Sequence, residues 1–121
     1  MRRSPSWSAL LVLLGLWGVW SALVPHRIRA EPPGDRTRGK SQYEQFCLVC
    51  HGSQGLGDGP MAKASTPPAP NLISRDVKSK KDQDLLAIIA DGKGNGMPAW
   101  RGILSDQGLL DIIAYIRSLG G

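Results

Sequence analysis

Two cysteines and a histidine fall within five consecutive residues, Cys47-Leu48-Val49-Cys50-His51. Two thiols and an imidazole can form a redox pair, a disulfide or part of a zinc site, or they can attach a haem. Residues three and four positions apart lie on one face of a helix. Cys47 and Cys50 can therefore bond two vinyl groups at one porphyrin edge, while His51 reaches the iron beneath the ring. Cys-x-x-Cys-His is also the attachment signature for haem c.

The other chemistries explain this motif less well. A thioredoxin-like redox pair needs a βαβ setting, and the chain has no period-2 run of β-branched residues. A structural zinc site needs four ligands, but residues 31–121 offer two Cys and one His. A disulfide in an exported chain would leave His51 without a role. We therefore predict one haem, covalently attached through Cys47 and Cys50, with His51 on its iron.

The second axial ligand is predicted to be a methionine. His51 is the only histidine after residue 30, so a second histidine ligand is not expected, and a soft thioether is the natural alternative. Both Met61 and Met97 are candidates, because the ten residues between His51 and Met61 can span about 33 Å when extended. Met97 is favoured because it lies in a glycine-rich loop, residues 94–98, that can lie flat against a porphyrin and present one sulfur.

The elements that must position these residues are predicted to be helices. Apolar residues recur at helical spacing over 41–50, 82–90 and 105–119, and Ser105 is a suitable N-cap for the last helix. Residues 52–72 are rich in glycine and proline and are predicted to form a loop. A loop this long suits a compact domain only if it wraps a large ligand. The body of about 90 residues is therefore predicted to be all-α, with its interior completed by the haem.

Charge and the first thirty residues indicate an exported protein. The chain of 121 residues suits one domain, and its formal charge of +5 falls to +1 from Glu31 onward, which is unfavourable for nucleic-acid binding. Arg2 and Arg3, the uncharged run 9–24 and Ala30 have the layout of a signal peptide over residues 1–30. The alternative is a retained anchor, but the apolar run is shorter than the roughly 20 residues that span a bilayer. Either way we expect a periplasmic location, with membrane contact only if the leader is retained.

Residues 31–38 are predicted to be a flexible polar segment, because two prolines and a glycine follow Glu31. The folded domain is then predicted to cover residues 39–121.

In this order, the motifs resemble those of the small class I (monohaem) bacterial cytochromes c, over residues 39–119. The pieces that carry the resemblance are Gly39-x-x-x-Tyr43-x-x-x-Cys47, His51-Gly52, Gly55-Leu56-Gly57-Asp58-Gly59-Pro60, Met97-Pro98-Ala99-Trp100 and the final helix 110–119. The resemblance implies the cytochrome c fold, in which three to four short helices wrap around one haem c. It also implies axial ligation by His51 and Met97, and electron transfer as the activity.

Two further residues receive roles from this resemblance. It implies that a proline carbonyl holds the second ring nitrogen of His51, with Pro60 as the best match and Pro67, Pro68 and Pro70 as alternatives. Trp100 is expected to pack on the haem edge and donate its N–H to a propionate, with plain core packing as the alternative.

We therefore expect a single-electron carrier, not an enzyme, that transfers electrons by an outer-sphere route to redox-partner proteins docked at the exposed haem edge. The alternative is the haem-bearing subunit of a larger exported oxidoreductase. An enzyme with a five-coordinate iron is less favoured, because the body offers no second histidine.

Overall fold

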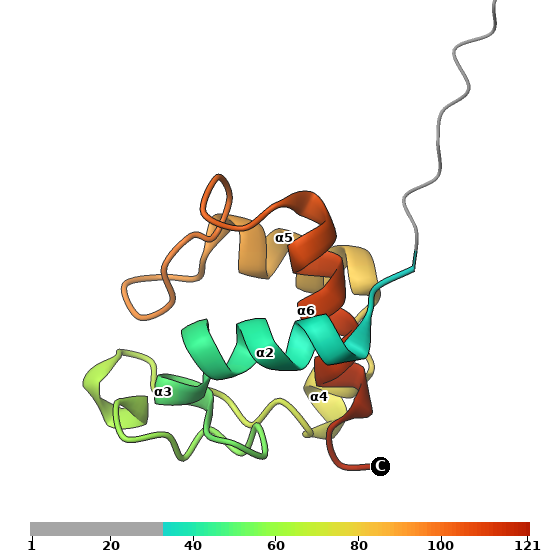
Figure 1. Cartoon of the computed structure of the whole chain (residues 1–121). Coiled ribbons are helices and arrows are strands. Elements are labelled where there is room, and N and C mark those ends of the chain that lie inside the picture. Colours follow the sequence, from blue (N-terminus) through green and yellow to red (C-terminus); the bar gives the residue numbers. More distant parts are fainter. Residues whose placement is uncertain (1–32) are drawn as a thin grey trace, which may run out of the picture. The chain divides into compact units, whose positions relative to one another are not determined.

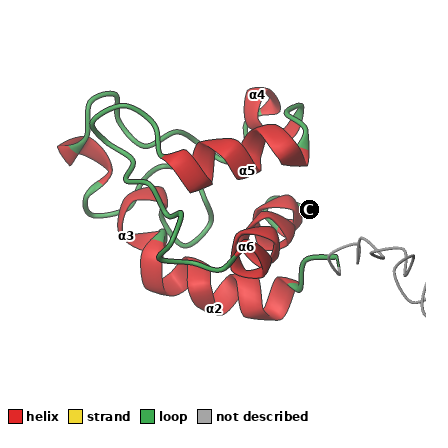
Figure 2. Ribbon diagram, turned by 90° about the horizontal axis from the view of Figure 1, so that it is seen from above, coloured by secondary structure: helices red, strands yellow, loops and turns green. Residues whose placement is uncertain are grey.

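The computed structural model describes residues 33–121, and the predicted signal peptide lies outside these residues. The helices are α2 (Arg36–Phe46), α3 (Leu48–His51), the 3-10 turn η3 (Ala62–Ala64), α4 (Arg75–Lys78), α5 (Asp82–Asp91) and α6 (Asp106–Ser118). Residues 33–121 contain no β-strand, only two isolated backbone bridges. The all-α prediction is confirmed for this part of the chain (Figure 2). None of the described helices has the length and apolar character that crossing a membrane requires.

The first described helix, α2, begins earlier than predicted. The carboxylate of Asp35 accepts hydrogen bonds from the backbone N–H groups of Thr37 and Arg38, which caps the helix start. The predicted flexible segment over residues 31–38 is therefore wrong from Asp35 onward. Two prolines and a glycine disfavour a helix before this point, but the capping aspartate that follows them starts one.

A single helix over 41–50 was also predicted, and the structure has two. Cys47 has a φ of −113° and separates α2 from the one-turn helix α3. Its N–H still donates to the Tyr43 carbonyl at 2.8 Å, and its carbonyl accepts from the His51 N–H at 2.9 Å. The chain thus changes direction at the first cysteine without losing its backbone hydrogen bonds.

The later helices follow the prediction closely. Helix α5 ends one residue after the predicted end at 90, and α6 is capped by Ser105, whose hydroxyl accepts from the Gly108 N–H at 3.0 Å. Residues 52–72 form the predicted loop, with η3 as its only helical turn. The short helix α4, capped by Ser74, was not predicted, because four residues show no periodicity.

Helices α2 and α6 cross steeply at the centre of the domain (Figures 1 and 2). Gly39 lies at the crossing, where a β-carbon would overlap the backbone carbonyl of Asp111. One turn further along α2, the buried ring of Tyr43 packs against Tyr115 with 5.1 Å between ring centroids. A glycine and two tyrosines therefore set how closely the two helices approach.

A buried carboxylate fixes the same crossing. Asp111 is 2% exposed and accepts hydrogen bonds from the Asp35 N–H at 2.7 Å, Arg38 Nε at 2.8 Å and Gln107 Nε2 at 2.9 Å. Burial raises the pKa of Asp111, but the hydrogen bonds from Arg38, Asp35 and Gln107 outweigh it, so the pKa lies below its ordinary value. Asp111 therefore ties the first turn of α2 to α6 in its charged form.

The core is built from the apolar faces of α5 and α6 and from Tyr43. Its buried residues include Leu85, Ile89, Leu109, Ile112, Ile113 and Ile116. Helix α3 and the loop after α5 lie at the same end of this assembly (Figure 1). Cys50, His51, Met97 and Trp100 lie in these two segments, and Cys47 directly precedes α3, whereas Pro60 lies in the loop over residues 52–72.

Candidate haem site

A cavity of about 470 Å³ opens beside the core, within the range of sites for small molecules and cofactors. Most of its lining is apolar and comes from α2, α5, α6 and the loops over residues 52–72 and 92–105, with Phe46, Leu72, Leu85, Ile88, Ile89 and Ile112 among its residues. Five of the predicted site residues also line it, namely Cys47, Cys50, His51, Met97 and Trp100. Pro60 and Met61 do not.

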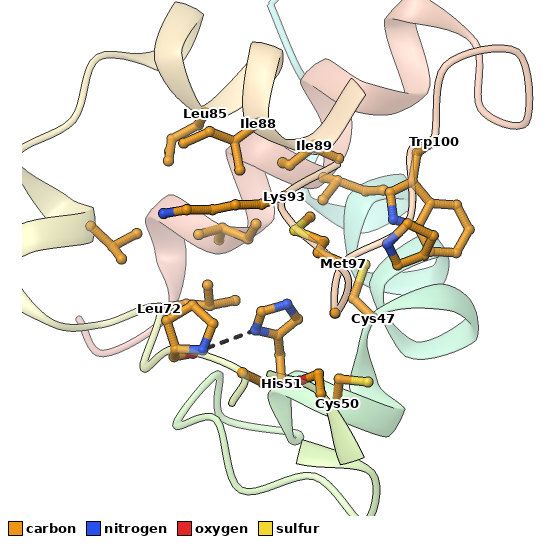
Figure 3. A pocket seen from close by; sticks show the side chains of 18 of the residues that line it. Cys47, Cys50, His51, Leu72, Leu85, Ile88, Ile89, Lys93, Met97 and Trp100 are labelled. Atoms are coloured by element: carbon orange, nitrogen blue, oxygen red, sulfur yellow. Dashed lines mark hydrogen bonds between the residues drawn. The ribbon is translucent and has the colours of Figure 1, made fainter. Parts of the chain in front are cut away.

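The turn of α3 presents the motif to one end of this cavity. His51 points into the space, and Cys47 and Cys50 lie together beside it (Figure 3). The two cysteines are not joined in a disulfide. Burial, and then the neighbouring Cys50, raise the pKa of the Cys47 thiol to about 11. A redox-active thiol needs a lowered pKa, so this environment does not favour a dithiol redox pair.

The zinc alternative also loses support. Residues 33–121 contain no group of three or more His, Cys, Asp or Glu side chains that could hold a metal ion. The two thiols therefore have no set of partners that would complete a structural zinc site.

His51 is held in one orientation and one tautomer. It is 9% exposed, and its Nδ1 lies 3.4 Å from the carbonyl oxygen of Pro70. A carbonyl only accepts hydrogen bonds, so this contact selects the tautomer with the proton on Nδ1 and leaves Nε2 with a free lone pair. Burial lowers the pKa of His51 and outweighs the opposing hydrogen bond to Pro70. The imidazole is therefore kept neutral, as a metal ligand must be.

The prediction that Pro60 supplies this carbonyl is wrong. The segment around Pro60 runs along the outside of α3, where the Gly59 N–H donates to the Cys50 carbonyl at 3.2 Å and the Met61 N–H to the Val49 carbonyl at 2.8 Å. The loop turns back later in the sequence and brings Pro70 under the imidazole.

Met97 reaches the cavity because its loop is closed by backbone pairing. The Lys93 N–H donates to the Met97 carbonyl at 3.0 Å, and the Met97 N–H donates to the Lys93 carbonyl at 3.2 Å. Residues directly opposite each other in such an antiparallel pair present their side chains on one face. Gly92, with a φ of +76°, allows the tight return, since a β-carbon there would meet the backbone of Met97 and Pro98. Met61 is 50% exposed and lies outside the cavity.

Trp100 lines the cavity and packs on Phe46, with 5.3 Å between ring centroids. Its backbone N–H donates to the carbonyls of Ile89 and Ala90, at 3.2 and 3.1 Å, which holds the loop against α5. The position agrees with both predicted roles, packing on the haem edge and packing in the core. Its hydrogen bond to a propionate stays a prediction.

Sequence reasoning did not assign a role to the Tyr43 hydroxyl. This group is buried and donates to the Gly52 carbonyl at 2.7 Å, which holds the chain immediately after His51. Burial is the main cause that raises the pKa of Tyr43 well above its ordinary value, so the phenol stays protonated as a donor. The only signal in the sequence was its position one helical turn before Cys47.

These residues fit a haem. The cavity is apolar, as a porphyrin requires, and its end carries two thiols at thioether spacing together with a neutral imidazole. Met97 also lines this cavity, so the residues present offer one nitrogen donor and one sulfur donor. An all-helical fold with this set of residues defines the class of the c-type cytochromes.

The comparisons with known proteins name the family. Residues 34–116 match the family described as cytochrome c oxidase, cbb3-type, subunit III, and the chain belongs to this family. It is a c-type cytochrome, a class of proteins that hold haem c covalently.

Individual relatives and a solved structure are consistent with this family. The chain is 32% identical to the cbb3-type cytochrome c oxidase subunit FixP of Bradyrhizobium diazoefficiens, over 72% of this chain and 28% of that protein. It is 31% identical to the corresponding subunit CcoP of Azospirillum brasilense, over 69% of this chain and 28% of that protein. The chain thus spans less than a third of these relatives. The KustC0563 c-type cytochrome shares the fold, with a TM-score of 0.59 and 18% identity over 67% of this chain and 95% of that one.

Proposed function

We propose that this chain carries one haem c in the cavity, attached through Cys47 and Cys50, with His51 and Met97 as axial ligands. It would pass single electrons between redox-partner proteins outside the cytoplasm by outer-sphere transfer. The observation that carries the proposal is that both thiols, the Nε2 of a neutral imidazole and a thioether converge on one apolar cavity.

The chain's own residues are suited to this activity. When bound, the haem supplies an iron that alternates between Fe(III) and Fe(II). His51 is oriented by the Pro70 carbonyl, and Met97 is fixed by its backbone pairing with Lys93, so neither ligand needs to move between the two states. The apolar lining excludes water and, with a thioether ligand, favours the less charged Fe(II) state. Two axial ligands also leave no open position for a substrate.

Mass spectrometry and carbon monoxide test the proposal. The mature protein should exceed its polypeptide mass by about one haem after acid–acetone extraction, because thioether bonds survive that treatment. The reduced protein should bind carbon monoxide poorly, because both axial positions are taken. Extractable haem would contradict the attachment, and ready binding of carbon monoxide would favour the enzymatic alternative.

A second candidate is the haem-bearing subunit of a larger exported oxidoreductase. The relatives FixP and CcoP are named as subunits of a cbb3-type cytochrome c oxidase, which favours it. Purification under native conditions distinguishes the two candidates. A partner retained at fixed stoichiometry through gel filtration would indicate a subunit, whereas a protein that elutes alone and exchanges electrons with soluble carriers would indicate a shuttle.

A further inference from the structure

Few charged side chains line the cavity, and they differ in whether an opposite charge lies beside them. Three charged side chains contribute to the lining, Asp76, Lys80 and Lys93. Asp76 and Lys80 lie one helical turn apart and form an ion pair at 3.6 Å. Lys93 has no ion-pair or side-chain hydrogen-bond partner within residues 33–121. The cavity thus carries one cation whose charge is not balanced by a neighbour in this part of the chain.

The backbone directs this cation inward. Because Lys93 and Met97 lie opposite each other in an antiparallel bridge, their side chains share the face that lines the cavity. Figure 3 shows the Lys93 ammonium on the side of the cavity away from Cys47 and Cys50. Lys93 is exposed as a whole residue, so its amine reaches the cavity from the solvent rim.

The chemistry of haem c matches this arrangement. A porphyrin attached through its vinyl groups at one edge carries its two propionate groups at the opposite edge, and these are carboxylates at neutral pH. A cation at the rim of an apolar site is stabilised by an opposite charge, and a carboxylate that leaves water needs a partner. The vinyl edge would lie at the cysteines, so the propionates would lie on the side of the cavity that carries Lys93.

We propose that Lys93 pairs with a haem propionate and thereby raises the reduction potential of the iron, an inference that rests on the proposed function. A negative carboxylate near the iron stabilises Fe(III) relative to Fe(II), and a cation beside that carboxylate cancels part of its effect. Lys93 is therefore both a positioning residue for the haem and a determinant of its potential, distinct from the axial ligands.

The test compares four holoproteins, the wild type, Lys93→Gln, Lys93→Arg and Lys80→Gln, by optical redox titration at low ionic strength. The Lys93→Gln variant should have a lower midpoint potential than the wild type, and Lys93→Arg should keep most of the wild-type value. Lys80→Gln is the matched control, because it removes an equal charge from the lining of the same cavity but leaves the Lys93–propionate pair intact, so its potential should fall less than that of Lys93→Gln. The shift in Lys93→Gln should shrink at high salt, because the pair lies at the rim.

Equal potentials for Lys93→Gln and Lys80→Gln would overturn the inference. So would loss of the near-infrared sulfur-to-iron absorption in Lys93→Gln, because Lys93 would then act by holding the Met97 loop. If haem is covalently attached in all four proteins and the potentials are equal, this inference alone fails. If the wild type carries no covalent haem, the proposed function fails first.

Discussion

Replacing Gly39 by alanine should destabilise the domain although the residue lies inside a helix. Glycine to alanine in a helix interior ordinarily gains up to about 1 kcal/mol. At Gly39, however, the new β-carbon would overlap the carbonyl of Asp111 and lie 3.0 Å from the Ile112 nitrogen. These are backbone atoms of α6, so no side-chain rotation can relieve the overlap, and the helices must separate.

The expected loss follows from two opposing terms. Overpacking of a well-packed contact costs about 1–3 kcal/mol, and the upper end applies because rigid backbone meets the new methyl group. Subtracting the helix gain leaves a net loss of about 2 kcal/mol. For a domain of this size, that corresponds to a melting temperature lower by roughly 8–16 °C.

Gly108 provides the matched control within α6. A β-carbon there would meet the end of the Gln42 side chain at 2.9 Å and Ser105 Oγ at 3.3 Å, and the flexible glutamine can move away. Gly108→Ala should therefore stay within about 0.5 kcal/mol of the wild type. The measurement is urea unfolding of the haem-loaded proteins followed by far-ultraviolet circular dichroism. If Gly39→Ala is as stable as Gly108→Ala, the close approach of α2 and α6 is wrong.

Three other predictions follow from the charge, the cavity and the leader. Asp111→Asn should lower the free energy of unfolding at pH 7 by about 1–2 kcal/mol. The pKa of Asp111 is lower in the folded state than in the unfolded state. Its contribution to the free energy of unfolding is therefore fully present above the unfolded-state pKa, and it is lost as the pH falls through the folded-state pKa. Unfolding measured against pH should therefore show the two proteins converging in acid, and a constant difference would contradict this. Cys47→Ser with Cys50→Ser should lose most helical circular dichroism, because the cavity would lack its ligand; a cooperative, native-like melt would count against the account. A chain starting at Glu31 and expressed in the cytoplasm should stay colourless, and red holoprotein there without maturation factors would contradict export.

The helices were predictable wherever local signals were complete. Helices α5 and α6 have apolar periodicity, and Ser105 is a cap that the sequence displays. The break at Cys47 was not predictable, since the residues on both sides of it are helical in pattern and the sequence carries no local signal for a φ of −113° at this cysteine. The start of α2 was not predicted for a different reason: Pro33 and Gly34 disfavour a helix, whereas the side chain of Asp35 directly after them caps one.

The site residues, too, were predictable only where local sequence brings them together. Cys47, Cys50 and His51 are neighbours in sequence, so the geometry of one helical turn brings them together. Which proline carbonyl contacts the His51 ring depends instead on the path of a long loop. That path is set by distant hydrogen bonds, such as the one from the Leu72 N–H to the Gly55 carbonyl. No local pattern could rank Pro70 above Pro60.

The most direct test of the account is the pair of variants Met97→Ala and Met61→Ala. Met97 lines the cavity with His51, whereas Met61 is half exposed outside it. Met97→Ala should abolish the near-infrared sulfur-to-iron absorption of the oxidised protein, lower the reduction potential and let carbon monoxide bind, and Met61→Ala should leave all three almost unchanged. The opposite pattern would show that the axial assignment is wrong. An unchanged spectrum in both variants would contradict methionine ligation and favour an iron open to substrate.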